Sequence, residues 1–223
     1  MTIPAQTVVQ EIQLLLQDPL GTRWPAWELV YHLNDGQREI AAMRPDMFVK
    51  TVSYPLAYGA RQRAPDDCVK LVELTRNTDG VAIRQVERNT IDAVEPNWYQ
   101  RARTNVIKNF TYDLRDPGTF YVYPPARGGT SVELVYSTAP VEIAPPIGDT
   151  SASVAGNIGV NDVFKNALIH FVLFRAFIKD AEYAANATLS AAHYQMFKAA
   201  VTDEFAARQA VRPTITDTPV TTG

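Results

Sequence analysis

Three histidines are the side chains of this sequence best suited to bind a metal ion or to transfer a proton. His32, His170 and His193 fall on three different predicted helices, and none has a second potential ligand at metal-binding spacing nearby. Imidazoles without such partners are typical of packed or solvent-facing positions. We therefore expect no metal site and no catalytic histidine.

Two pairs of carboxylates have the spacing for acid–base chemistry, but their surroundings do not favour it. Asp66 and Asp67 follow a proline in a predicted loop, and Asp180 and Glu182 lie at the polar edge of a predicted helix. Both settings are typical of solvated carboxylates. The sequence also contains no G-x-S-x-G elbow, no G-x-x-x-x-G-K-[ST] loop and no G-x-G-x-x-G motif. These residue patterns indicate neither a catalytic site nor a cofactor site.

Two arginine clusters remain as candidate contact residues. Arg61 and Arg63 lie in YGARQRAPDD, and Arg101 and Arg103 lie in WYQRARTNVIK beside aromatic residues, a combination also found in nucleic-acid grooves. Arginine outnumbers lysine 15 to 6, and its planar guanidinium suits ion pairs in protein interfaces. We interpret these four arginines as subunit-interface residues rather than as a DNA site.

Composition and length predict a folded protein that can bury a substantial core, in one domain or in two small ones. The chain has 223 residues, of which 46% are hydrophobic and 20% charged, with a formal net charge of −3. The single cysteine, Cys68, fits a reducing compartment. The N-terminal MTIPAQTVVQEIQ lacks the features of a secretory signal, and the apolar run Ala167–Ile178 is too short and too polar for a membrane span. We expect neither export nor membrane insertion.

Residues 1–46 are predicted to form two helices of a bundle. VVQEIQLLLQD has helical periodicity, and a second helix is expected from Pro25 to Met43, before Pro45. Gly36 costs about 1 kcal/mol relative to alanine in a helix interior, yet it lies on the apolar stripe of this helix. We expect another helix to approach closely there. The predicted packing residues are Leu33, Gly36, Ile40, Phe171 and Phe174.

Residues 47–150 are predicted to form an inserted antiparallel β domain. CVKLVEL and VAIRQVER, joined by Thr78-Asp79-Gly80, predict a hairpin. The segment FTYDLRDPGTFYVYPPARGGTSVELVYS predicts three further strands joined by glycine-containing turns. The segment TIDAVEPNWYQRARTN between these groups is predicted as a loop or a short helix.

Residues 151–210 return to helical periodicity after a loop rich in small residues. VFKNALIHFVLFRAFIKDAEY has apolar residues on two sides, and a last helix is expected from Leu189 to Arg208. We predict an α+β fold in which a helical bundle is closed by the N- and C-terminal helices. A helix that is apolar on two sides needs a second cover, so we assign its second strip to a subunit interface. That strip consists of Ile169, Val172, Leu173 and Ala176.

Residues 211–223 lose this periodicity. Pro213, Pro219 and five threonines favour an extended chain that orders only on a partner, where TITDT can add to a sheet edge. The predicted binding residues are Val211, Arg212, Pro213, Thr214, Ile215 and Thr216.

Two stretches carry a resemblance to a known family. WELVYHLNDGQREIAAMRPD and NALIHFVLFRAFIKDAEYAANATLSAAHYQMFKAAV resemble the N- and C-terminal signatures of tailed-phage head-to-tail adaptors, the ring proteins related to podovirus tail tubular protein A. FYVYPPARGGTSVELVYSTAP is similar to the β region of that family. The glycine- and serine-bearing loop before Asn161 departs from the family pattern.

The resemblance implies a structural virion protein without enzymatic activity or cofactor, assembled in the bacterial cytoplasm. It implies a dodecameric ring between the portal and a downstream tail or nozzle protein, with double-stranded DNA passing through without sequence-specific binding. It also implies that the C-terminal tail docks on the portal. Two alternatives stay open: an enzyme, which would need a cleft of convergent polar groups, and a tail-associated receptor- or glycan-binding module, which would fit the aromatic β segment.

Overall fold

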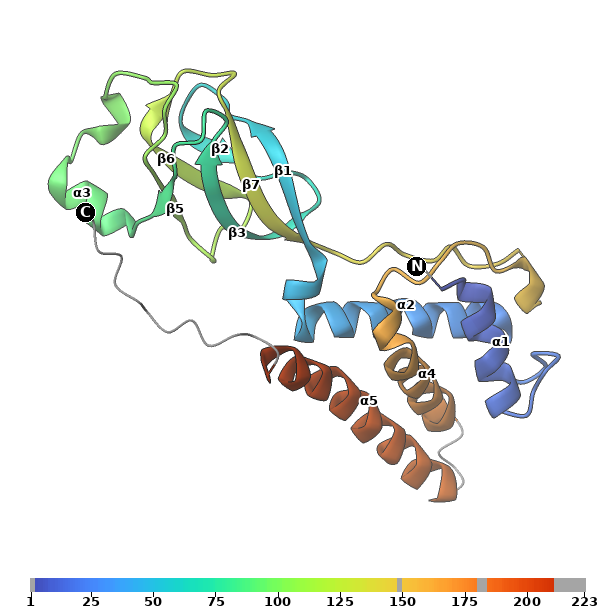
Figure 1. Cartoon of the computed structure of the whole chain (residues 1–223). Helices are drawn as coiled ribbons and strands as arrows, with labels where there is room; N and C mark the ends of the chain where they lie inside the picture. The colour runs from blue at the N-terminus through green and yellow to red at the C-terminus, as the bar shows by residue number, and fades with distance from the viewer. Residues whose placement is uncertain (1–2, 148–149, 180–183, 211–223) are drawn as a thin grey trace. The chain divides into compact units, whose positions relative to one another are not determined.

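The computed structural model describes residues 3–147, 150–179 and 184–210 (Figure 1). The chain divides into two compact units: Met1–Met43 together with Val141–Gly223, and Arg44–Pro140. The first unit is helical and the second is built from β strands. This arrangement confirms the predicted α+β class, with helices from both ends of the chain and β structure between them.

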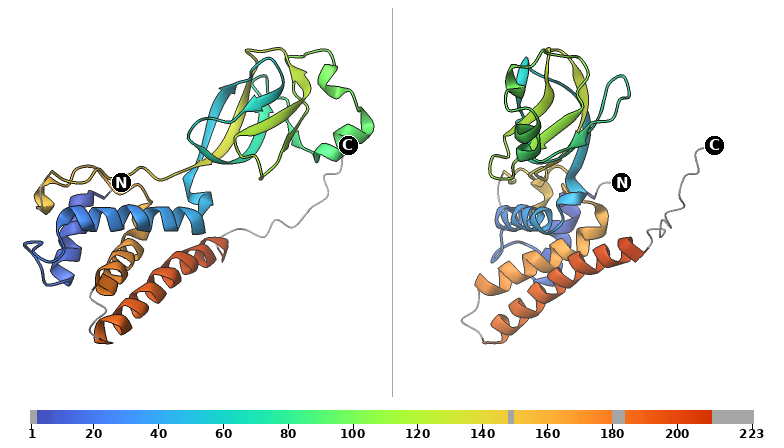
Figure 2. Two further views of the ribbon diagram at one scale, coloured as in Figure 1. Left: turned by 180° about the vertical axis from the view of Figure 1, so that it is seen from behind. Right: turned by 90° about the vertical axis from the view of Figure 1, so that its left-hand side faces the viewer.

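The helical unit is organised around one central helix. Helix α4 packs against each of the other three long helices of the unit, and Figure 2 shows α4 and α5 lying side by side. Because α4 is covered on several sides, it buries residues around most of its circumference. The four helices are α1 (Ala5–Leu15), α2 (Ala26–Met43), α4 (Lys165–Lys179) and α5 (Ala184–Ala210).

The boundaries of α2 follow from local chemistry. Before it, the Asp18 carboxylate accepts hydrogen bonds from the backbone N–H groups of residues 22, 23 and 24 at 2.8 to 2.9 Å, which orders the connection from α1. The helix ends at Met43 because Pro45 disfavours helical geometry at the residue before it. At the start of α2, burial acts to raise the pKa of Asp18, but the three backbone hydrogen bonds to its ionised carboxylate outweigh it and lower the pKa.

Gly36 lies at the contact between α2 and α4. A Cβ atom at this position would lie 2.9 Å from Phe171 Cδ1 and 3.1 Å from Leu168 Cδ2. The neighbouring stripe residues Leu33 and Ile40 are fully buried. Phe171 is buried as well, and Phe174, half-buried, meets it edge-on with 5.8 Å between ring centroids. The absent side chain therefore sets how closely the two helices approach.

Two buried side-chain amides of α2 form hydrogen bonds with the segment that follows the β unit. Asn34 Nδ2 donates to the Ile143 carbonyl at 2.9 Å, and the Ile143 N–H donates to Asn34 Oδ1 at 2.9 Å. Gln37 Nε2 donates to Asn34 Oδ1 at 3.1 Å, and the Gly159 N–H donates to Gln37 Oε1. Buried polar groups need such partners, so these residues fix the path of the chain where it re-enters the helical unit.

The β unit consists of two sheets whose facing sides enclose one core. Strands β6 and β7 alternate between buried and half-buried residues, as expected for strands with one face in a core. The first sheet has the order β1 (Val49–Pro55), β7 (Ser131–Thr138) and β3 (Cys68–Asn77). The second has the order β2 (Gly59–Arg63), β6 (Thr119–Ala126), β5 (Asn109–Tyr112) and β4 (Arg84–Gln85).

The predicted hairpin between residues 68–74 and 81–88 is wrong. The turn forms, since the Asn77 N–H donates to the Val81 carbonyl at 2.8 Å, but only an isolated bridge follows it. Strand β3 pairs with β7, and β4 pairs in parallel with β5 in the other sheet, which makes that sheet mixed. The reason lies in the core: Ile83 is buried between the sheets, so the chain crosses there instead of continuing along β3.

Helical boundaries differ in two further places. Helix α5 begins at Ala184, five residues before the predicted Leu189. The segment predicted as a loop or a short helix, residues 90–105, holds most of α3 (Arg88–Val94) and a 3-10 helix (Trp98–Gln100), and α3 begins at the end of the strand predicted over residues 81–88. Both of these short helices lie beside the second sheet (Figure 1), where they build the surface described next.

Candidate assembly surfaces

An aromatic layer covers the outer side of the second sheet. Along β6, Tyr121 and Tyr123 point away from the core between the sheets and pack against Trp98, which is fully buried. Tyr99 stacks on Trp98 with 3.8 Å between ring centroids, and the Trp98 indole N–H donates to Asp92 at 2.7 Å. Four rings are thereby held rigidly outside the main core, where they contribute a second apolar cluster.

Arginines are arranged around these rings. The Arg88 guanidinium lies 5.9 Å from the ring centroid of Tyr99 and 5.7 Å from that of Tyr121. Arg61 lies exposed on β2, directly opposite Tyr121 of β6. We call the set Arg61, Arg88, Tyr99 and Tyr121 the arginine–aromatic surface. Guanidinium groups over aromatic faces are frequent in protein interfaces.

Arg101 is fixed within this region. It donates to Glu95 at 2.5 Å and to the Tyr123 hydroxyl at 2.6 Å. Hydrogen bonds from Tyr123 and Arg101 lower the pKa of the Glu95 carboxyl, and the same Glu95 bond is the largest cause of a raised pKa at Tyr123. The ionised carboxylate therefore holds Arg101 in place, so this guanidinium is less available to a partner than that of Arg61.

The other two predicted arginines lie apart. Arg103 stacks over Tyr58, with 4.6 Å from its guanidinium carbon to the ring centroid, near the end of β6. Arg63 is exposed at the end of β2 and forms an ion pair of 3.4 Å with Asp66. The structure thus brings Arg61 and Arg101 to the aromatic layer, while Arg63 lies at the end of β2 and Arg103 lies in the loop before the Thr104 bridge to β6.

The two units carry opposite net charge. Residues 44–140 contain thirteen lysines and arginines against eleven carboxylates, a balance of +2, whereas the remainder contains eight against thirteen, a balance of −5. A whole-chain charge of −3 conceals this division. Units of opposite sign can attract the complementary unit of another copy.

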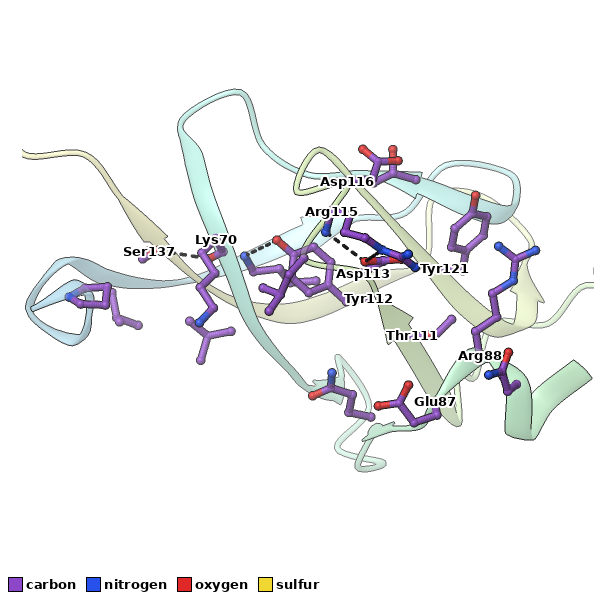
Figure 3. Close-up of a pocket in the computed structure, with 18 of the residues that line it drawn as sticks. Lys70, Glu87, Arg88, Thr111, Tyr112, Asp113, Arg115, Asp116, Tyr121 and Ser137 are labelled. Atoms are coloured by element: carbon purple, nitrogen blue, oxygen red, sulfur yellow. Dashed lines mark hydrogen bonds and ion pairs between the residues drawn. The ribbon is translucent and has the colours of Figure 1, made fainter. Parts of the chain in front are cut away.

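A groove of about 1110 Å³ opens between β3, the β5–β6 connection and α3 (Figure 3). Its most strongly perturbed group is Asp113, whose pKa is lowered to about 2 by hydrogen bonds from the Arg115 side chain and backbone. A general acid or base at neutral pH needs a pKa near 7, so this carboxylate is shifted in the wrong direction. Figure 3 shows Asp113 and Arg115 facing each other, which leaves a mixed-charge surface groove and not a catalytic pair.

The second apolar strip of α4 is covered by the chain itself. Ile169, Val172, Leu173 and Ala176 are all buried within the helical unit. The other helices of the unit provide the second cover that this strip needs. Residues buried within one chain are not free to contact a second copy, so these four residues belong to the core of the helical unit and not to the predicted subunit interface.

An exposed aromatic pair lies on α2 instead. Trp27 and Tyr31 are 41% and 51% exposed and meet edge-to-face with 6.0 Å between ring centroids. Trp27 precedes Gly36 by nine residues, two and a half helical turns, so it lies on the side of α2 opposite α4. The sequence analysis missed this pair, although exposed Trp and Tyr are the residues most enriched at interface centres.

The three histidines lie on three different helices, as predicted, and two of them are in contact. His170 of α4 and His193 of α5 lie with their Nδ1 atoms 3.0 Å apart, and burial lowers the pKa of both. His32 is separate, and its pKa is lowered by burial first and by Arg175 second. Among the described residues, no group of three or more histidine, cysteine or acidic side chains could hold a metal ion.

The predicted partner-binding tail, Val211 to Thr216 within residues 211–223, lies outside the described residues. Within the described part of the chain, no helix has the length and apolar character needed to cross a bilayer.

Comparison with known proteins identifies the family. No curated protein matches the chain. The family model for the SU10 adaptor protein matches residues 3–222, which includes both units and their connections. The chain therefore belongs to the SU10 adaptor protein family and is a structural adaptor of the bacteriophage virion.

Proposed function

We propose that this adaptor forms a closed ring, dodecameric as the family resemblance implies, that joins the portal to the tail and encloses a passage for DNA. The family match supports the adaptor role. The ring is inferred from two exposed surfaces that differ in chemistry: the arginine–aromatic surface of the β unit, and the face of α2 in the helical unit that carries Trp27 and Tyr31. Contact between two different surfaces of identical copies is heterologous, and it generates a ring when the rotation between copies closes.

The arginine–aromatic surface is the first half of this contact. Arg61 has an exposed side chain on a rigid strand, and the rings beneath it are locked by Trp98 and Asp92. A preorganised guanidinium loses little conformational freedom on binding, which favours affinity. Its charge suits the helical unit of a neighbouring copy, where carboxylates predominate.

The exposed face of α2 is the second half. Trp27 and Tyr31 provide an apolar centre, and Asp35 follows Tyr31 by one helical turn. Asp35 forms ion pairs of 2.7 Å with Arg38 of α2 and 3.6 Å with Arg175 of α4, so it is held in position at the edge of this face. An aromatic centre with charged residues at its rim matches the usual anatomy of a protein interface.

A closed ring would also account for DNA passage and for binding to the portal and the tail. DNA would cross the lumen without base-specific contacts, consistent with a formal net charge of −3. The portal would bind on one side, through residues 211–223, and a tail protein on the other. We further propose that the protein has no catalytic activity, because the Asp113–Arg115 pair in the groove beside β3 remains ionised at neutral pH.

A glycan-binding role is disfavoured by the geometry of the aromatic layer. Sugars stack on free aromatic faces, but Tyr99 has Trp98 stacked on its ring at 3.8 Å and the Arg88 guanidinium 5.9 Å from its ring centroid. These contacts occupy the ring with residues of the same chain. The layer is thus better suited to support arginines than to receive a carbohydrate.

Charge reversal at Arg61 tests the proposed contact. Arg61→Glu, mixed with purified portal rings, should lower the yield of adaptor rings seen by electron microscopy at least tenfold, because it places a carboxylate against an acidic unit. Arg115→Glu is the matched control: the same charge change at an exposed arginine of the same unit, outside the arginine–aromatic surface. Wild-type ring yield from Arg61→Glu, or equal losses in both variants, would contradict the assignment.

A further inference from the structure

Two histidines that the adaptor role does not use face each other where α4 and α5 pack. His170 and His193 come from these neighbouring helices, and both rings are partly buried. Their Nδ1 atoms are 3.0 Å apart while their ring centroids are 5.3 Å apart, so the two nitrogens meet head-on. This is the geometry of a direct N–H···N hydrogen bond. Phe177 stacks on His193 with 5.6 Å between centroids and 10° between planes, which holds that ring in place.

This hydrogen bond limits how many protons the pair can carry. When both rings are neutral, one ring donates from a protonated Nδ1 and the other accepts with a bare Nδ1. One added proton leaves the bond intact, because an imidazolium donor and a neutral acceptor form a charge-assisted hydrogen bond. A second added proton gives both Nδ1 atoms an N–H group and both rings a positive charge. Two such donors cannot remain 3.0 Å apart, so the rings must separate.

The surroundings of the pair do not relieve this repulsion. Burial lowers the pKa of His170, and burial first and the charge of His170 second lower the pKa of His193. Three carboxylates of α1 and α2 lie beside α4, but each forms an ion pair with a cation of α4, and Lys198 of α5 lies over the Tyr194 ring. The three ion pairs are Glu11–Lys165, Glu28–Lys179 and Asp35–Arg175. In the described part of the chain, a doubly charged pair would therefore have no carboxylate partner.

We propose that His170 and His193 form an acid-sensitive latch, which takes up at most one proton while α4 and α5 are packed together. The latch is important to α5 because that helix has few other buried contacts. Its described part, residues 185–203, buries three side chains: Ser190, Phe197 and Val201. A helix held by so few buried side chains depends strongly on each link to its neighbour.

The latch stabilises the packed helices at neutral pH and loses this effect in acid. In the unfolded chain, the two histidines titrate independently near about pH 6.5, so both are protonated near about pH 5. The packed pair holds one proton at most, so unfolding in acid takes up about one more proton than it would without the latch. By mass action, the unfolding equilibrium constant gains about a tenfold increase for each unit by which the pH falls. The stabilisation is complete above about pH 6.5 and declines below it.

The first test counts these protons in full-length protein. Urea unfolding at several pH values between 5 and 8 gives the number of protons taken up, as the slope of the logarithm of the unfolding constant against pH. The four proteins are the wild type, His170→Gln, His193→Gln and the double variant, and His32 contributes equally to all of them. Each single variant should lose about one proton of uptake near pH 5, and the double variant should lose hardly more. Far-ultraviolet circular dichroism confirms that each variant folds.

Two outcomes of this test would overturn the proposal. An unchanged slope in both single variants would show that the pair does not limit proton binding. Losses that add up in the double variant would show two independently buried histidines, because coupled groups lose the effect together when either one is removed.

The second test needs no variant, so it holds even if a substitution prevents folding. Nuclear magnetic resonance of wild-type protein labelled with ¹⁵N-histidine, at pH 7.5, should show a protonated Nδ1 on one ring and a bare Nδ1 on the other. A scalar coupling between these two nitrogens should appear across the hydrogen bond. Two rings that are both protonated at Nε2 and bare at Nδ1 would have no donor between them, and this result would refute the latch.

Discussion

The contact between Gly36 and Phe171 allows a quantitative prediction for Gly36→Ala. Alanine would favour the helix by about 1 kcal/mol, because glycine is the weaker helix former. Its Cβ, however, would lie 2.9 Å from Phe171 Cδ1 and 3.2 Å from Phe171 Cγ. Inserting a carbon into a packed core costs about 1 to 3 kcal/mol.

The position of Phe171 decides which effect is larger. Its ring is in edge-to-face contact with Phe174 and with Phe197, whose centroids lie 5.8 and 5.1 Å away, so it cannot retreat without disturbing both. We therefore take an overpacking cost near the middle of the range and expect Gly36→Ala to lower the free energy of unfolding by about 1 kcal/mol. Gly36→Leu adds a larger side chain at the same place and should destabilise more.

A double-mutant cycle isolates the contact. Phe171→Leu removes the obstructing ring, so Gly36→Ala in that background should be neutral or stabilising, with a coupling of about 1 to 2 kcal/mol. Urea unfolding followed by circular dichroism at 222 nm measures this directly, because the long helices all belong to the unit that contains Gly36. If Gly36→Ala stabilises the protein equally in both backgrounds, α4 does not restrict this position.

Three further perturbations test other parts of the helical unit. Asn34→Ala removes both hydrogen bonds to Ile143 and leaves buried backbone groups unpaired. It should therefore lower the free energy of unfolding by about 2 to 3 kcal/mol in the same urea assay. Unchanged stability would mean that the hydrogen bonds between Asn34 and Ile143 are not required. Leu173→Asp places a charge at a side chain that is 4% exposed, so it should prevent folding of the isolated chain and reduce its ellipticity. A folded variant with an unchanged melting temperature would show that this position is accessible to water. The lowered pKa of His32 means that the folded state takes up its proton less readily than the unfolded chain, so its contribution to stability is complete above pH 6.5 and declines as the pH falls below that value. Thermal melting between pH 5 and 8 should therefore show a weaker pH dependence in His32→Gln, and an identical dependence in both proteins would exclude this group.

The sequence predicted what depends on local periodicity. The limits of α2 follow from its apolar stripe and from Pro45, and the β5–β6–β7 strands follow from alternating residues between glycine-containing turns. These features require no knowledge of distant residues. The same holds for Gly36, whose position on the apolar stripe already indicates a close approach.

Features that depend on pairing across the chain were not predictable in this way. Nothing near Ile83 indicates that it enters the core between the sheets, and this single burial redirects β4 to the second sheet. The strip that contains Leu173 looked uncovered because its cover comes from other helices. His170 and His193 are 23 residues apart in the sequence, and only the antiparallel register of α4 and α5 brings them together.

The exposed surfaces were predictable only in part. The sequence singled out Arg61 and Arg101 beside aromatic residues, and the structure shows the aromatic layer that supports them. It did not reveal Trp27 and Tyr31 as exposed, because a hydrophobic residue on a helix is more often buried. The exposure of a side chain depends on which elements pack beside it. The face of α2 that carries Trp27 and Tyr31 can therefore be recognised only once the position of α4 is known.

Cryo-electron microscopy of the full-length protein mixed with portal rings of the same phage would show whether the protein forms a closed ring on the portal. We expect a single adaptor ring of twelve copies coaxial with the portal, in which the arginine–aromatic surface of each copy faces α2 of the next. Particles in which the portal carries no adaptor, or in which the adaptor forms open filaments or dimers through identical surfaces, would refute the proposed ring.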